Sequence, residues 1–350
     1  MTAWLALCCV LVATMVAVGG YTRLSGSGLS ITEWAPVRGT VPPLTEAQWK
    51  EQFARYLESP EGRLVNSSLD LAGFQRIFLV EWGHRFLGRL VGFVTVVPLA
   101  WFLWRRALDR RTARRGLLAA ALVGAQGAMG WLMVKSGLVD VPHVSTVRLG
   151  AHLLLAFAIF AVLAWELFDL VLAPATVSAR RLVFGARAFL AVIVVTVASG
   201  AAMAGTHAGW AFSTFPTMNG RFLPDGVFEG GPRAAIQDPL TAHFDHRAMA
   251  LVVLIFAIAL PYLARGEARA VQRRVALVLG AVALQITLGA ATVMLRMPVW
   301  MAVVHQVWGL GLFATALGLV HGTVSAQPSE RAMPSASPRQ GVADVEGLSG

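Results

Sequence analysis

The sequence predicts an all-α integral membrane protein with eight transmembrane helices, arranged as two pseudo-twofold-related four-helix bundles. Three observations support this fold class. Hydrophobic residues make up 56% of the 350-residue chain and charged residues only 14%, against about 25% in soluble domains. The apolar residues gather in eight long runs, and these runs divide into two similar sets of four. A water-soluble enzyme, a disordered chain and a fibrous protein are excluded, because none of them could hide so much apolar surface.

Each of the eight apolar runs is predicted to cross the bilayer, because a hydrocarbon core about 30 Å thick requires about 20 apolar helical residues. The runs are Trp4–Gly20, Phe78–Trp104, Gly116–Val134, Val147–Leu172, Phe184–Gly205, His243–Leu263, Val271–Leu295 and Val299–Val324. The first run could be a signal peptide. No basic residue precedes it and its apolar stretch is long, so an uncleaved span is favoured. Cys8 and Cys9 are adjacent within it, which predicts no disulfide framework.

The arginines orient the predicted spans. The net charge is +10, and basic residues cluster in the connections after the second, fourth and sixth runs. Cytoplasmic connections carry an excess of Lys and Arg, so these three connections and both termini are expected to face the cytoplasm. Nucleic acid is not needed to explain the charge. The segments 21–76 and 206–242 then face outward, and residues 325–350, rich in Ser, Pro, Gly and Ala, are expected to form a disordered cytoplasmic tail.

The first four and the last four spans are similar enough to be two copies of one unit. The matching residues are Gln126 and Gln285, Gly130 and Gly289, His84-Arg85 and His246-Arg247, and His152 and His305. Because each copy has four spans, both copies have the same orientation, and the repeat is a parallel one about an axis along the membrane normal. We therefore expect an N-terminal four-helix half over residues 1–175 and a C-terminal half over residues 176–324.

Four of the eight histidines lie near the starts of even-numbered spans, at a similar depth close to the outer face. They are His84, His152, His246 and His305. Two imidazoles that face each other across a helical bundle are what bis-histidine ligation of a haem iron requires. The alternative is a set of helix-packing residues, and the repetition of the pattern argues against it. A zinc site is disfavoured, because no cluster of cysteines or carboxylates accompanies the histidines.

Glu81 is the candidate catalytic residue. It precedes His84 by three positions, so both lie on one helix face. A carboxylate beside a haem ligand could act as a base or nucleophile, or could stabilise a cationic intermediate. The alternative is a salt bridge to Arg85. The second half has His243 at the matching position, and this asymmetry predicts one catalytic and one non-catalytic haem site.

The other polar residues near the membrane surfaces have several interpretations. His143, His207 and His321 are interpreted as ordinary interface residues, whereas His243 could be a loop residue or an alternative ligand. Arginines at the outer ends, which include Arg85 and Arg247, could pair with haem propionates, because the guanidinium fork binds carboxylates bidentately. Their alternative role is interfacial snorkelling.

Two motifs resemble those of the haem A synthase family. Glu81-Trp-Gly-His84-Arg85 resembles the family's ExxHR motif, and the Gly-Xaa-Thr-Arg-Leu-Xaa-Xaa-Ser-Gly-Leu-Ser stretch over 20–30, continuing to Trp34 and Pro36, resembles its first outer loop. The resemblance covers about residues 1–324. One branch of the family carries cysteine pairs in the outer loops, and these are missing here. The chain therefore resembles the branch of alphaproteobacteria and mitochondria, and a mechanism that needs those cysteines is not available to it.

The resemblance implies an oxidoreductase that oxidises the C8 methyl group of haem O to a formyl group, giving haem A for the terminal cytochrome oxidase. The implied residues are His246, His305 and Arg247 for a permanent haem b, and His84, His152 and Arg85 for the substrate haem O. Glu81 would lie by the reacting porphyrin edge. The implied location is the bacterial inner membrane, with the haem sites near the periplasmic face. A haem O synthase and an electron acceptor are the implied partners, and a homo-oligomer stays open.

Two other classes of function fit part of the pattern. A di-haem b electron-transfer cytochrome would use the same four histidines without substrate chemistry, but Glu81 occurs in one half only. A small-molecule transporter built from a parallel repeat usually has spans that break near the midplane. In this chain the polar residues gather at the outer edge instead.

Overall fold

The structure, a computed structural model, describes residues 1–34, 38–138, 142–172 and 179–324. Over these residues the regular structure is helical, apart from one isolated β-bridge between Met218 and Arg221. Eight helices are long and apolar enough to cross a membrane. They are α1 (Thr2–Leu24), α4 (Leu71–Trp104), α5 (Arg110–Gly137), α6 (Thr146–Val171), α7 (Arg180–Gly205), α9 (Pro239–Leu263), α10 (Arg269–Met294) and α11 (Val299–Val324). The predicted all-α class with eight spans is confirmed. The predicted tail and the boundary at 175/176 lie outside the described residues.

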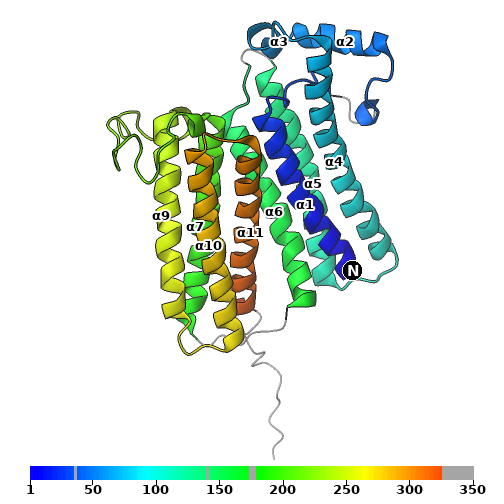
Figure 1. Ribbon diagram of the computed structural model, residues 1–350. Coiled ribbons are helices and arrows are strands. Elements are labelled where there is room, and N and C mark those ends of the chain that lie inside the picture. Colours follow the sequence, from blue (N-terminus) through cyan, green and yellow to red (C-terminus); the bar gives the residue numbers. More distant parts are fainter. Residues whose placement is uncertain (35–37, 139–141, 173–178, 325–350) are drawn as a thin grey trace, which may run out of the picture.

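The eight long helices form two groups of four that stand side by side (Figure 1). One group contains α1, α4, α5 and α6, and the other contains α7, α9, α10 and α11. The helices α1, α6, α7 and α11 contact one another across the boundary and carry much of the buried core. Phe157 of α6 and Phe313 of α11 meet there edge to face, with ring centroids 5.2 Å apart. The arrangement is consistent with the predicted pair of bundles.

Burial repeats between the two halves. The buried residues of α6 are Phe157, Ile159, Leu163, Ala164 and Glu166, and at the matching positions α11 buries Leu310, Leu312, Ala316, Leu317 and Leu319. In the same way, Leu5, Cys8, Val12 and Gly20 of α1 match Ala186, Phe189, Ile193 and Ala201 of α7. Equivalent helices therefore turn the same face to the core, as expected of two copies of one unit.

The flanking helices expose large apolar side chains. Phe93 of α4 is 63% exposed, Leu251 of α9 is 58% exposed and Leu277 of α10 is 64% exposed. In water such surfaces would be costly, whereas in hydrocarbon an apolar helix surface is the stable one, and the helix satisfies its own backbone hydrogen bonds. The outer surfaces of both bundles therefore suit a lipid environment.

A small helical cap covers one end of the N-terminal half (Figure 1). It contains α2 (Glu46–Leu57) and α3 (Pro60–Leu64), and η1 (Arg38–Thr40) precedes them. Tyr56 of α2 packs with Phe74 and Phe78 of α4 in a separate apolar cluster. The helix α4 begins earlier than the predicted start at Phe78, because the Asp70 side chain caps it by accepting from the Gly73 N–H at 2.8 Å. We call this end of the molecule the cap end. In the second half, η2 (Ala208–Trp210) and α8 (Ala234–Gln237) precede α9.

A charged network joins the two halves at the opposite end, which we call the arginine end. Arg115 of α5 is paired with Glu166 and, at 2.8 Å, with Asp169 of α6. Asp169 in turn lies 2.7 Å from Nε2 of His321 on α11. His321 is 3% exposed, so the structure differs from its interpretation as an interface residue. Its ring fills the space between α6 and α11, where it also contacts Trp165.

Candidate functional site

Each of the four predicted ligand histidines lies against a glycine of a neighbouring helix. The pairs, with the nearest distance from an ideal glycine Cβ to the imidazole ring, are Gly19 and His84 at 3.2 Å, Gly130 and His152 at 3.2 Å, Gly200 and His246 at 3.0 Å, and Gly289 and His305 at 2.9 Å. A side chain at any of these glycines would press on the ring. The glycines come from α1, α5, α7 and α10, and the histidines from α4, α6, α9 and α11. Each glycine therefore leaves room for one imidazole ring, and we call each such place a notch, named by its glycine.

In the C-terminal half the two histidine rings face each other. The ring centroids of His246 and His305 are 6.4 Å apart, and the ring planes are perpendicular. A metal ion between two imidazole nitrogens, with bonds of about 2 Å, separates the ring centroids by about 6 Å. The pair therefore offers two imidazoles at a centroid separation that fits a metal ion between them.

The N-terminal pair shares the glycine and glutamine neighbours of the C-terminal pair. Gln126 contacts His152 twice. Nε2 of Gln126 lies 3.3 Å from Nε2 of His152 and 3.1 Å from the backbone oxygen of His152. Gln285 repeats these contacts with His305, at 3.4 and 3.3 Å. Among the described residues, no ring contact joins His84 to His152 as one joins the C-terminal pair. The two halves therefore share these contacts, and among the described residues the ring contact within a pair occurs in the C-terminal half.

Glu81 is held by four hydrogen bonds. One carboxylate oxygen accepts from the Ser30 hydroxyl at 2.8 Å and from the Ile31 N–H at 2.9 Å. The other accepts from Arg85, from Nε at 3.1 Å and from Nη2 at 2.7 Å. The side chain of Glu81 is almost fully buried. The salt bridge considered from the sequence is present, and the segment that follows α1 supplies the other two donors.

The two arginines beside the ligand histidines have different surroundings. Arg85 donates to Glu81 and also to the backbone oxygens of Ile31 and Glu33, so all three of its nitrogens have partners. Arg247 donates through Nη1 to Pro216 and Thr217. Its Nη2 is buried and has no partner among the described residues. A buried guanidinium nitrogen without an acceptor is costly, so Arg247 is the better placed of the two to meet a propionate.

His243 takes the place of Glu81 in the second half. It lies within α9 rather than in a loop, is 1% exposed, and its Nδ1 is 3.0 Å from the backbone oxygen of Ala208. Nδ1 must therefore carry the proton and donate it to that oxygen. Glu81 and His243 are thus equivalent buried positions, and in both halves the segment after the first helix holds the side chain.

A second buried carboxylate, which the sequence did not single out, lies in the cap. Glu61 of α3 is 7% exposed, and its carboxylate is 3.5 Å from the hydroxyl of Tyr56, which accepts from Asn66 at 2.6 Å. Burial, followed by the negative charge of Glu81, raises the pKa of Glu61 to about 7. The cap therefore places an acid that titrates near neutral pH in the electrostatic field of Glu81.

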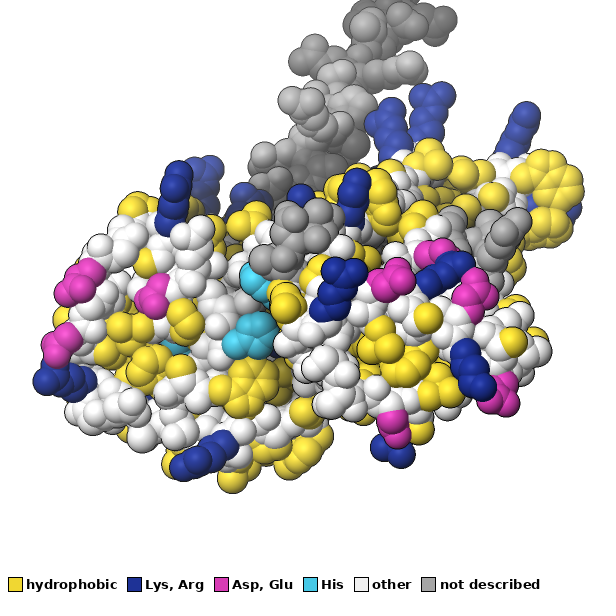
Figure 2. Space-filling model, turned by 90° about the horizontal axis from the view of Figure 1, so that it is seen from above, with side chains coloured by type: hydrophobic (Ala, Val, Ile, Leu, Met, Phe, Trp, Pro, Cys, Tyr) yellow, Lys and Arg dark blue, Asp and Glu magenta, His cyan; other side chains and the backbone are white. Residues whose placement is uncertain are grey.

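The surface of the cap end is mixed in charge. Figure 2 shows acidic and basic side chains together on this face, with histidine side chains reaching the surface near its middle. His143 and His207 are exposed, and the ring of His207 stacks on Trp210 with centroids 5.9 Å apart. Within the described chain, neither His143 nor His207 makes a hydrogen bond or ring contact with any of the four predicted ligand histidines.

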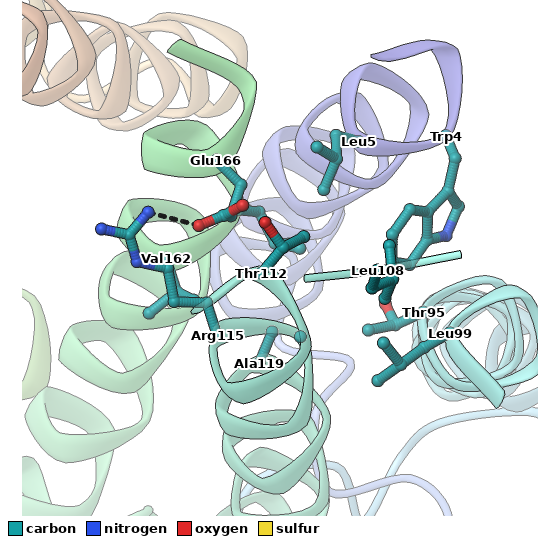
Figure 3. Close-up of a pocket in the computed structure, with 12 residues that line it drawn as sticks. Trp4, Leu5, Thr95, Leu99, Leu108, Thr112, Arg115, Ala119, Val162 and Glu166 are labelled. Carbon is teal, nitrogen blue, oxygen red and sulfur yellow. Dashed lines mark hydrogen bonds and ion pairs between the residues drawn. The ribbon is translucent and has the colours of Figure 1, made fainter. Parts of the chain in front are cut away.

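A small apolar pocket lies away from the histidines, toward the arginine end of the N-terminal half (Figure 3). Residues from α1, α4, α5 and α6 line it, and the Arg115–Glu166 ion pair lies at its edge. Thr95 and Leu99 of α4 lie about three to four turns beyond His84 along a helix that rises about 1.5 Å per residue. The pocket therefore does not belong to the histidine site.

Comparisons with known proteins cover nearly the whole chain. Residues 2–317 match the family described as cytochrome oxidase assembly protein. A protein of Nitrosospira multiformis named heme A synthase is 43% identical over 327 residues, which cover 91% of this chain and 92% of the relative. Proteins of the same name from Rhodopseudomonas palustris and Paracoccus denitrificans are 40% and 39% identical, over 97% and 91% of this chain and 95% and 86% of their own lengths.

Proposed function

Because this chain belongs to the cytochrome oxidase assembly protein family, we propose that it is a haem A synthase. It would oxidise the C8 methyl group of haem O, stepwise through an alcohol, to the formyl group of haem A. The observation that carries this proposal is the combination of two histidine pairs with a buried carboxylate, Glu81, one turn before the first histidine of the N-terminal half, where the C-terminal half has His243. Relatives named heme A synthase at about 40% identity support the same activity.

The C-terminal pair is proposed to hold haem b. His246 and His305, with ring centroids 6.4 Å apart, would hold it, and the buried Nη2 of Arg247 would donate to a propionate. When bound there, haem b would supply one-electron transfer away from the substrate. The protein's own task in this half would be to hold the two imidazole rings against Gly200 and Gly289.

The N-terminal pair is proposed to bind haem O through His84 and His152. Glu81 lies one helical turn from His84 on the same face of α4, which supports its place at the reacting edge of the porphyrin. Each of its oxygens already accepts two hydrogen bonds. To take up a proton, Glu81 would first have to give up one of these hydrogen bonds. The geometry therefore favours stabilisation of positive charge over abstraction of a proton.

The orientation of the chain follows from the same proposal. The arginine end carries Arg105 and Arg106 just after α4, Arg110 and Arg111 at the start of α5, and Arg265 and Arg269 between the end of α9 and the start of α10. This supports a cytoplasmic location for this end. The cap end and the four histidines would then lie toward the periplasm of a bacterial inner membrane. A haem O synthase that delivers the substrate and an electron acceptor are the proposed partners.

The test replaces Glu81 by Ala and by Gln and identifies the extracted haems by chromatography and mass. We expect normal haem b content, with the product arrested at haem O or the alcohol and conversion lowered by about 100- to 1000-fold, as for the loss of an electrostatic group at a reacting centre. The matched control is Glu58→Gln, at an exposed cap residue. A normal yield of haem A from both Glu81 variants would remove Glu81 from the mechanism.

The same haem extraction from the unaltered protein distinguishes a haem A synthase from the main alternative, a di-haem electron-transfer cytochrome. The glycine, glutamine and histidine contacts are alike in the two halves, and this likeness is what a di-haem electron-transfer cytochrome would require. Such a protein would release haem b alone. A synthase would release haem b together with haem O, the alcohol or haem A.

A further inference from the structure

The side chain of Ser199 determines which nitrogen of His246 carries the proton. The Ser199 hydroxyl lies 3.0 Å from Nδ1 of His246 and 2.8 Å from the backbone oxygen of Thr196. A hydroxyl has one hydrogen, and a backbone oxygen can only accept. Both contacts are satisfied only if Ser199 donates to Thr196 and accepts from Nδ1–H of His246. In a neutral imidazole, Nε2 then keeps its lone pair, which is the tautomer that binds a metal through Nε2.

The contacts of Ser199 also fix the orientation of the ring. Gly200, the next residue of α7, lies against Cε1 of His246, with an ideal Cβ only 3.0 Å away. The ring is therefore bounded by the helix backbone on one side and anchored by one hydrogen bond. Partners of this kind, behind a metal-binding histidine, typically change metal affinity by about 10- to 100-fold.

The N-terminal half has Val18 at the equivalent position. The matched burial of Leu5 and Ala186, and of Val12 and Ile193, sets the register of α1 on α7. In this register Gly19 corresponds to Gly200, and both lie against the first histidine of their half. The residue before each glycine is Val18 in one half and Ser199 in the other.

The His84 ring consequently lacks the anchor that His246 has. No hydrogen bond reaches it from any residue in the described part of the chain, and Nε2, rather than Cε1, is its nearest atom to the ideal Cβ of Gly19. The second histidine of each pair is held alike, by Gln126 in one half and Gln285 in the other. The hydrogen bond to the first histidine is therefore one contact that differs between the sites, because α7 supplies it in one half and α1 does not supply it in the other.

We propose that Ser199 is the positioning residue that makes the C-terminal half the site that retains its haem, and that Val18 leaves the N-terminal half free to exchange. This inference rests on the proposed function, in which one haem stays and the other arrives as substrate and leaves as product. A cofactor site gains from a preorganised ligand, because less ordering is needed on binding. A substrate site that bound haem with equal affinity would release its product too slowly.

The test uses the isosteric pair Ser199→Val and Ser199→Thr in the full-length, detergent-purified protein. Ser199→Val copies the residue of the other half, and Ser199→Thr has the same shape but keeps the hydroxyl. We expect Ser199→Val to lose haem b about 10- to 100-fold more readily during washing. The haem b that remains should have a higher midpoint potential, since its ligand is less basic. Ser199→Thr should retain haem b and the original potential.

The reciprocal variant, Val18→Thr, tests the other half of the proposal. It should increase the amount of haem O, alcohol or haem A that stays with the protein, while haem b content remains normal. Haem b retention and potential in Ser199→Val equal to those of the unaltered protein, or losses shared by Ser199→Thr, would overturn the role of Ser199. Unchanged substrate-haem retention in Val18→Thr would overturn the explanation of exchange. If the unaltered protein yields no haem O, alcohol or haem A, the proposed function fails instead.

Discussion

The close contact between Gly289 and His305 leads to a quantitative prediction about the proposed haem b site. In Gly289→Ala, an ideal Cβ would lie 2.9 Å from Cε1 of His305 and 3.4 Å from its Nδ1. Carbon atoms in contact prefer about 3.5 to 4.0 Å, so the ring or helix must move by about 0.5 Å or more. His305 cannot move freely, because Gln285 contacts its ring and its backbone. Overpacking of this kind costs about 1 to 3 kcal/mol.

This cost converts to a change in haem b binding. At about 1.4 kcal/mol for each tenfold change in affinity, Gly289→Ala should bind haem b about 5- to 150-fold more weakly. The assay is the haem b content per protein after purification and after extended washing. Gly280→Ala is the matched control, because Gly280 lies in the same helix and its added Cβ would meet nothing within 4 Å.

The control removes the main confounding effect. Alanine favours a helix over glycine by up to about 1 kcal/mol, and both variants share that gain. Gly289→Ala should therefore lose haem b while Gly280→Ala does not, although both proteins fold. Equal haem b contents in the two variants would refute the argument that the glycine makes room for the His305 ring.

Three further predictions concern other parts of the molecule. In the N-terminal half, Gly130→Ala should lower conversion of haem O while haem b content stays normal, and Gly127→Ala, where an added Cβ meets nothing within 4 Å, should change neither. The pKa of Glu61 is raised from 4.5 to about 7, so its contribution to cap stability is full below pH 4.5 and is lost as the pH rises through about 7. Hydrogen exchange of residues 46–64 should show this loss of stability, and Glu61→Gln should abolish the pH dependence. Cysteines introduced at Lys50 and Arg110, both exposed, should react with an impermeant reagent from the periplasmic and cytoplasmic sides respectively, and labelling of both from one side would contradict the orientation.

Much of the architecture was predictable, because the bilayer imposes a length and a composition on each helix. The eight apolar runs correspond to the eight long helices, and the motif matches between the halves reappear as matched contacts of Gln126 and Gln285 with their histidines. The start of α4 was placed too late. Its first turns are stabilised by the Asp70 cap and by packing of Tyr56 on Phe74, which an apolar-run criterion does not detect.

The parts of the site that were not predictable depend on contacts between segments far apart in the chain. Glycines are frequent here, 34 in all. Gly130 and Gly289 stood out as matched positions of the repeat, but nothing in the sequence alone distinguishes Gly19 or Gly200 from the others. Glu61 lies in a polar segment, and its burial depends on how the cap packs on α4. The difference between Ser199 and Val18 becomes visible only when α1 and α7 are aligned, and the matched burial of the two helices supplies that alignment.

The two halves differ most at the buried position one turn before the first histidine, and that difference extends into the outer segments. A buried carboxylate is costly unless several donors surround it, and Glu81 takes two of its four from Ser30 and Ile31. His243 needs one backbone oxygen, that of Ala208. The carboxylate therefore requires the connection after α1 as much as it requires α4. In the proposed function, these differences at the cap end, together with Ser199 in place of Val18, would separate a retaining site from a reacting site built on one helical repeat.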